Sequence, residues 1–263
     1  MNKLFTLLML WMLSCLPSLA QAPMDGGVWK DNTGKHINAH GGNIFNYKGT
    51  YYWYGESRSA DGKPYSSLGV SCFTSKDLKK WTNHGLVLPV TDEPGSDIEG
   101  GCIIERPKVL YNQKTKKFVM WFHLELKGRG YGAARYGVAT SDTPFGPFKF
   151  IRSGRVNPGI YPVGFSKPDT TDLKHQLLFP ELKAWWTPEW RKQIERGMFW
   201  MRDFEGGQMS RDMTIFIDDD GKAYHIYSSE DNLTLQIAQL TDDYMQHNGS
   251  YVRVAAGGQN EAP

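Results

Sequence analysis

The sequence predicts an all-β protein built from radially repeated sheets, a β-propeller, and three observations predict it. A strand, a tight turn and an aromatic strand recur in units that start at His40, Glu105 and Arg211. Each unit continues into a third strand that ends in a Ser/Thr-Asp turn followed by an aromatic residue. Helical periodicity is scarce outside one insertion. Repetition of such units at this spacing is typical of propeller blades.

The expected strands follow the same order in every unit. First strands are expected at 40–45, 105–110 and 211–216, and the aromatic second strands at 51–54, 118–122 and 223–227. Third strands are expected at 70–73, 136–140 and 235–240, with Trp81, Phe148 and Tyr244 after their turns. An outer fourth strand then closes each blade, as 251–254 does in the third unit.

These repeats divide residues 23–263 into blades. Blade 1 is expected at about 36–95, blade 2 at 103–152, blade 3 at 208–256 and the start of blade 4 at 257–263. An insertion at about 153–207 holds Thr187-Pro188-Glu189, which predicts a capped helix from Trp190 to Met198. Its tryptophans form either a sugar-stacking wall or a small core, and packing is the interpretation that we favour.

The composition and the N-terminal residues narrow down the partners and the location expected for this protein. Of 263 residues, 40% are hydrophobic and 22% charged, and the net charge of +2 comes from interspersed signs, which argues against nucleic acid as a partner. Residues 1–22 predict a signal peptide and export to the periplasm or the outside. A lipid anchor at Cys15 is the alternative, and a membrane span is not expected. Cys72, in an apolar strand, is expected to be a buried thiol.

The motifs resemble those of glycoside hydrolase family 43, a family of five-bladed β-propeller glycosidases. Segment 210–224 resembles a blade opening of that family, and Glu261-Ala262-Pro263 resembles its later Glu-x-Pro blade start. Segments 37–42 and 105–109 are similar to the branch that contains exo-β-1,3-galactanases. The resemblance implies about three blades plus the start of a fourth here, a chain truncated at its C-terminus, and little activity of this chain alone.

The resemblance also implies roles for particular residues in an inverting hydrolysis. Glu261 matches the general acid, and Asp212 matches the carboxylate that orients this acid and keeps its pKa high. Glu105 matches a pocket carboxylate that places substrate or water. Gly41 stands where the family usually has its general base, so no carboxylate fills that position.

Two further residues are candidates for substrate binding, His40 beside the vacant base position and Arg211. No metal and no cofactor are expected, because the Asp218-Asp219-Asp220 run lacks the alternating ligands of a calcium loop and reads as a hairpin turn.

Structural roles stay open for each of the three carboxylates. In these alternatives, Glu261 is a solvated residue at the chain end and Asp212 caps a strand start beside Arg211. Glu105 pairs with Arg106 or Lys108 on the surface.

The sequence is compatible with three alternative functions. The first is an exported exo-acting hydrolase of β-1,3-galactan or arabinogalactan side structures. The second is an α-L-arabinofuranosidase or β-D-galactofuranosidase on the same scaffold, since pocket shape sets the choice of sugar. The third is a non-catalytic carbohydrate-binding propeller, which the glycine at the base position favours.

Overall fold

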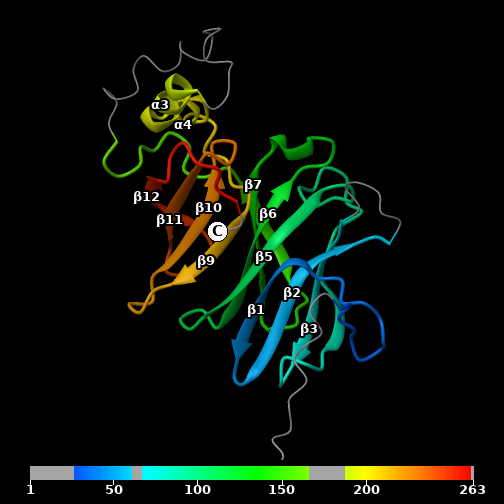
Figure 1. Cartoon of the computed structure of the whole chain (residues 1–263). Coiled ribbons are helices and arrows are strands. Elements are labelled where there is room, and N and C mark those ends of the chain that lie inside the picture. Colours follow the sequence, from blue (N-terminus) through cyan, green and yellow to red (C-terminus); the bar gives the residue numbers. More distant parts are fainter. Residues whose placement is uncertain (1–26, 61–66, 166–186, 262–263) are drawn as a thin grey trace, which may run out of the picture.

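The computed structural model describes residues 27–60, 67–165 and 187–261, which form three four-stranded antiparallel sheets (Figure 1). The first sheet holds β1 (His40–Tyr47), β2 (Thr50–Arg58), β3 (Ser67–Ser75) and β4 (Thr82–Pro89). The second holds β5 (Ile103–Asn112), β6 (Lys117–Glu125), β7 (Arg135–Ser141) and β8 (Lys149–Gly154). The third holds β9 (Met213–Ile217), β10 (Ala223–Ser229), β11 (Thr234–Leu240) and β12 (His247–Val254). The all-β prediction is confirmed, and the sheets are consistent with propeller blades.

Strands in each sheet pair in chain order, with hairpin turns at the predicted places. One strand starts later than expected: β9 begins at Met213, and residues 211 and 212 precede it. The backbone N–H of Arg211 donates to the carbonyl of Ser228, whose own N–H donates to the carbonyl of Asp212. Arg211 and Asp212 thus both oppose Ser228, as in a β-bulge. Regular pairing of β9 with β10 begins only after Asp212. The number of blades in the whole protein stays a prediction.

The sheets pack face to face through residues that alternate along their strands. On β6, Phe118, Met120 and Phe122 face the first sheet, whereas Val119 and Trp121 face the third. All five are buried. The second sheet is therefore covered on both faces, and the first strands β1, β5 and β9 lie next to one another in that order.

Two helices beside the third sheet replace the single helix predicted from Trp190 to Met198. Thr187 caps α3 (Pro188–Arg196) as predicted, because its hydroxyl accepts a hydrogen bond of 3.1 Å from the N–H of Trp190. The helix stops short of Met198 because Gly197 adopts a left-handed conformation at φ 97°, and α4 (Met198–Arg202) follows in a new direction.

Packing is the role of the tryptophans that the structure describes in this region. Trp190 joins a small core with Ile194, Met198, Phe199 and Leu233. Trp200 is fully buried, and its indole N–H donates to the Tyr251 hydroxyl at 2.8 Å.

The remaining predictions divide by where they fall. Cys72 is a buried free thiol as predicted, and Cys102 is another. The signal peptide at 1–22, Cys15, Trp185, Trp186 and the last two residues lie outside the described residues. In the described part of the chain, no helix is long and apolar enough to cross a membrane.

Candidate active site

A cavity of about 350 Å³ opens where the first strands of the second and third sheets begin. Its walls come from six separate parts of the chain: the starts of two first strands, the end of β6 and three loops. The lining residues are Glu105, Arg106, His123, Tyr131, Arg211, Asp212, Asn232 and Glu261.

Irregular pairing marks the starts of the first strands β1 and β5, and the irregular start of β5 carries Glu105 and Arg106 at this cavity. The β1–β2 register shifts between His40 and Asn43, and the β5–β6 register shifts between Glu105 and Lys108. A bulge turns a side chain out of the regular alternation and is common beside active sites. Within the second bulge Arg106 has a left-handed backbone, with φ 53°.

Glu105 accepts hydrogen bonds from two side chains and lies beside an imidazole. Arg58 Nη2 lies 3.1 Å from its Oε1, the Tyr131 hydroxyl donates to the same oxygen at 3.0 Å, and His123 Nδ1 lies 3.3 Å from Oε2. Burial alone raises the pKa of this carboxyl. The contacts of His123, Tyr131 and Arg58 outweigh burial and hold the pKa below its ordinary value. Glu105 is thus a carboxylate at neutral pH, able to accept hydrogen bonds.

Asp212 pairs with Arg106 across the cavity. Arg106 Nη2 donates to Asp212 Oδ2 at 2.8 Å, and both side chains are partly exposed. Burial, together with the charge of Arg106, lowers the pKa of nearby Lys108 to about 8. Arg106 at the cavity and Lys108 near it thus place cationic groups beside the carboxylate of Asp212.

Gly41 faces the same arginine. Its φ is 57°, and a Cβ added there would lie 3.3 Å from Arg106 Cδ. The stem of Arg106 consequently lies over Gly41, the position where the resemblance predicted that a base carboxylate is missing. A side chain at residue 41 would need an unfavourable left-handed backbone as well as movement of that stem.

Glu261 is exposed, and two side-chain amides donate hydrogen bonds to one of its carboxylate oxygens. Its Oε1 accepts hydrogen bonds from Asn232 Nδ2 at 3.2 Å and from Gln259 Nε2 at 3.1 Å. Asn232 ends a turn of three successive left-handed residues, Glu230, Asp231 and Asn232. That turn also binds the backbone of the Glu261 segment, since Asn260 N–H donates to the carbonyl of Asn232 at 2.7 Å.

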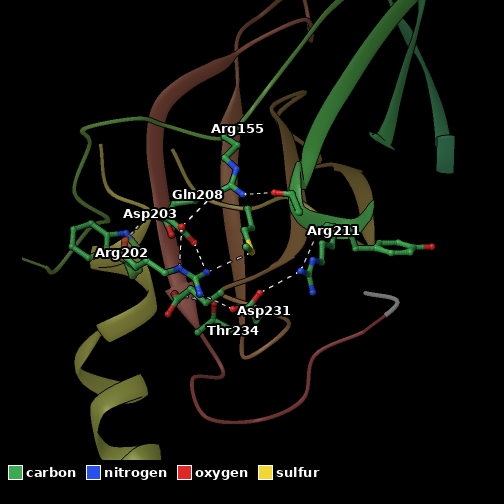
Figure 2. Close-up of polar contacts among 12 residues, drawn as sticks. Arg155, Arg202, Asp203, Gln208, Arg211, Asp231 and Thr234 are labelled. Carbon is green, nitrogen blue, oxygen red and sulfur yellow. Dashed lines mark hydrogen bonds and ion pairs between the residues drawn. The ribbon is translucent and has the colours of Figure 1, made fainter. Parts of the chain in front are cut away.

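Arg211 supports the cavity wall. Its Nη2 donates to the carbonyl of Tyr131 and to Asp231 Oδ1, each at 3.2 Å. Figure 2 shows Arg202 and Arg211 converging on Asp231, with Arg155 above them in this view. The loop that carries Tyr131 is thus fastened to the third sheet.

One grouping in the described chain has the spacing of metal ligands: Glu105, His123 and Asp212 offer atoms that lie within 4.8 Å of one another. Two of these groups already face protein cations, Arg58 at Glu105 and Arg106 at Asp212. We therefore assign no metal to the site.

Several solved structures resemble this chain. A glycoside hydrolase family 43 β-1,3-galactosidase, solved with galactodeoxynojirimycin, is 58% identical with a TM-score of 0.83, over 90% of this chain and 68% of that one. The chain belongs to glycoside hydrolase family 43. Family 43 exo-β-1,3-galactanase structures that are similar come from Clostridium thermocellum, at 36% identity and TM-score 0.68, and from Phanerochaete chrysosporium with galactose, at 31% and 0.64.

The coverage of these structures is uneven. The two exo-β-1,3-galactanases each match 90% of this chain, which spans 42% and 43% of their own lengths. No family model matches the chain, and no curated protein matches it.

Within this family 43 chain, most of the predicted site residues come together. Glu105, Arg211, Asp212 and Glu261 line one cavity. His40 does not: its Nδ1 lies 3.3 Å from Glu56 Oε2, and it lines a neighbouring cavity of about 460 Å³ with Trp29 and Trp53. The catalytic and binding roles of these residues stay predictions.

The ion pairs differ from the structural alternatives weighed for the sequence. Glu105 faces Arg58 and not Arg106 or Lys108, and Asp212, for which a cap at the strand start beside Arg211 was the alternative, forms an ion pair with Arg106. The bulge at Arg106 explains the partner of Glu105, because it separates the directions of adjacent side chains.

Sequence reasoning missed four residues of the site. Arg106 and Asn232 give only weak signals, a basic residue inside a Glu-x-Pro motif and an asparagine in an Asp-Asn turn. His123 lies in an aromatic strand, where the pattern predicts a core residue, and Tyr131 lies in a glycine-rich loop. The period of two along β6 offered one clue, since it places His123 and Glu125 on the same face.

Proposed function

We propose that this protein is an exported, inverting glycoside hydrolase that removes terminal sugars from β-1,3-galactan or from arabinogalactan side structures. The observation that carries the proposal is the gathering of Glu105, Asp212 and Glu261 around one cavity of about 350 Å³. A pocket of this size suits the end of a sugar chain. The similar structures titled β-1,3-galactosidase and exo-β-1,3-galactanase support the choice of linkage.

In this proposal Glu261 donates the proton to the leaving oxygen. It is exposed at the cavity and lacks a cation among its hydrogen-bond partners, Asn232 and Gln259. Asp212 across the cavity orients the acid, and Glu105 accepts hydrogen bonds from sugar hydroxyls. Gly41 has no side chain to activate water, so a group other than residue 41 serves as the base.

Replacing Glu261 by Gln tests the proposal in the full-length protein. We expect hydrolysis of β-1,3-galactotriose to fall about a hundred- to ten-thousandfold, because the amide cannot donate the catalytic proton. Binding of the trisaccharide, measured by calorimetry, should persist. Asp220→Asn, in an exposed turn, is the matched control and should keep full activity.

The same assays separate the other functions. Binding of galactan without turnover by the unmutated protein would indicate a carbohydrate-binding propeller. Preference for aryl α-L-arabinofuranoside or β-D-galactofuranoside over β-1,3-galactan would indicate the alternative glycosidases. Proton NMR of the first galactose released should show the α-anomer if the enzyme inverts, and N-terminal sequencing of the exported protein should show cleavage near residue 22.

A further inference from the structure

Behind Glu105 lies a buried polar pair that the proposed reaction does not itself use. His123 and Glu125 are two residues apart on β6, so they share the face that carries Trp121 and looks toward the third sheet. His123 Nε2 lies 2.8 Å from Glu125 Oε1. The exposed fraction of His123 is 1% and that of Glu125 is 0%. Buried charged groups are costly unless paired, so this placement calls for a reason.

The pair makes contacts in two directions. Toward the cavity, His123 Nδ1 lies 3.3 Å from Glu105 Oε2. Away from the cavity, Glu125 Oε2 accepts hydrogen bonds from the backbone N–H groups of Ala133 and Ala134, both at 2.9 Å. These amides follow directly after η1 (Gly130–Gly132), the short turn that carries Tyr131.

The contacts close a ring, since the Tyr131 hydroxyl donates back to Glu105. The loop is fixed on its other side as well. Arg155 donates to the carbonyls of Gly132 and Ala133, and Arg211 donates to that of Tyr131. A single buried carboxylate, Glu125, thereby anchors both the histidine behind Glu105 and the tyrosine in front of it.

We propose that His123 and Glu125 form a positioning pair, which keeps Glu105 in its anionic, hydrogen-bond-accepting form and holds the Tyr131 loop against it. The inference deepens the proposed function and rests on it. Neither residue of the pair is assigned contact with the reacting bond.

The electrostatics of the surroundings support the pair. The charged and titratable groups that face His123, or reach it through Glu105, come from several elements: Glu105 on β5, Glu125 on β6, Tyr131 on η1, Arg58 and Glu56 on β2, and Asp212. Burial disfavours the imidazolium, but the two flanking carboxylates outweigh burial and raise the pKa of His123. The cation between two carboxylates in turn favours the anionic form of Glu105.

Kinetics of His123→Gln in the full-length protein test the proposal, with β-1,3-galactotriose as substrate between pH 4.5 and 8. Loss of the imidazolium should raise the pKa of Glu105, so the acid limb of kcat/KM should move up by about one pH unit, a tenfold loss at the acid end. The loss should appear mainly in KM, because Glu105 binds sugar. Glu125→Gln should shift the limb in the same direction by less.

His84→Gln is the matched control, because His84 lies on the surface against Thr74. It should leave the profile unchanged. A purely structural role for His123 predicts a different outcome, an equal loss of activity at every pH with superimposable limbs, and that outcome would overturn the proposal.

A second readout needs no activity. The NMR titration of His123, assigned from the spectrum of His123→Gln, should show an imidazole that stays protonated above pH 6.5 and loses its proton at lower pH in Glu105→Gln. A titration at or below the ordinary value in the unmutated protein would sink the positioning pair. Absence of galactan turnover, with the NMR result intact, would instead reject only the proposed function.

Discussion

Gly41 shows how much one residue decides in this site. Gly41, predicted to stand at the family's usual base position, has a left-handed backbone, and Arg106 lies over it. The guanidinium that reaches past Gly41 holds Asp212. At this position the small residue, the bent backbone and the ion pair depend on one another.

We expect Gly41→Ala to destabilise the protein by about 1–3 kcal/mol, because a non-glycine residue is strained at φ 57° and its Cβ would press on Arg106 Cδ. Gly49→Ala is the matched control: φ is 71°, and an added Cβ there meets nothing within 4 Å. Urea unfolding of the full-length variants measures the difference. If Gly41→Ala loses no more stability than Gly49→Ala, the Arg106 contact is unimportant.

Among the elements, the turn between β10 and β11 has an unusual backbone. Three successive residues have positive φ, from 52° to 67°. Arg253 on β12 stabilises this turn through a two-pronged ion pair with the fully buried Glu230. Arg253 Nε lies 2.6 Å from Glu230 Oε1, and Arg253 Nη2 lies 2.9 Å from Glu230 Oε2. The same arginine donates to the carbonyls of Ile194 and Glu195 in α3. The turn in this way presents Asn232 to Glu261.

Arg253→Met should cost about 3–5 kcal/mol of unfolding free energy, because it leaves Glu230 buried without its cation. Thermal and urea unfolding would measure the loss. Adding Glu230→Gln should recover part of it, since the uncompensated charge is then removed. Lys114→Met breaks the exposed Lys114–Asp242 pair and should cost no more than about 1 kcal/mol. Equal costs for the two methionine variants would contradict this account.

At the scale of the whole molecule, packing between sheets places the carboxylates of different strands around one cavity. Trp121 is central to this packing: it is fully buried between the second and third sheets, and its indole N–H donates to the carbonyl of Tyr244 at 2.8 Å. Its ring lies 5.1 Å from those of Tyr136 and His225.

Trp121→Ala should destabilise the protein by about 3–5 kcal/mol, because it opens a large cavity between two sheets. Activity should fall as well, since Glu105 lies on the second sheet while Arg211 and Asp212 precede the third. Phe145→Ala removes an exposed ring stacked on His84 and should cost less than about 1 kcal/mol. Circular dichroism melts compare the variants, and equal melting temperatures would refute a central role for Trp121.

The sequence alone predicted the sheets and most of their strands, because period-two patterns, turn residues and aromatic strands are local features. Its motifs also pointed to Glu105, Arg211, Asp212 and Glu261, which the structure brings to one cavity. The helix cap at Thr187 could be predicted because capping is also a local feature. Only the end of that helix was predicted wrongly.

Only the tertiary structure decided which charges meet. Arg106 turns away from its neighbour Glu105 to reach Asp212, and Arg58 arrives from another sheet to hold Glu105. His123 looked like core in a strand of aromatic residues, yet it faces a carboxylate on each side. Bulges and contacts between sheets set these partners, and both depend on residues far apart in the chain, whereas the strands themselves depend on near neighbours.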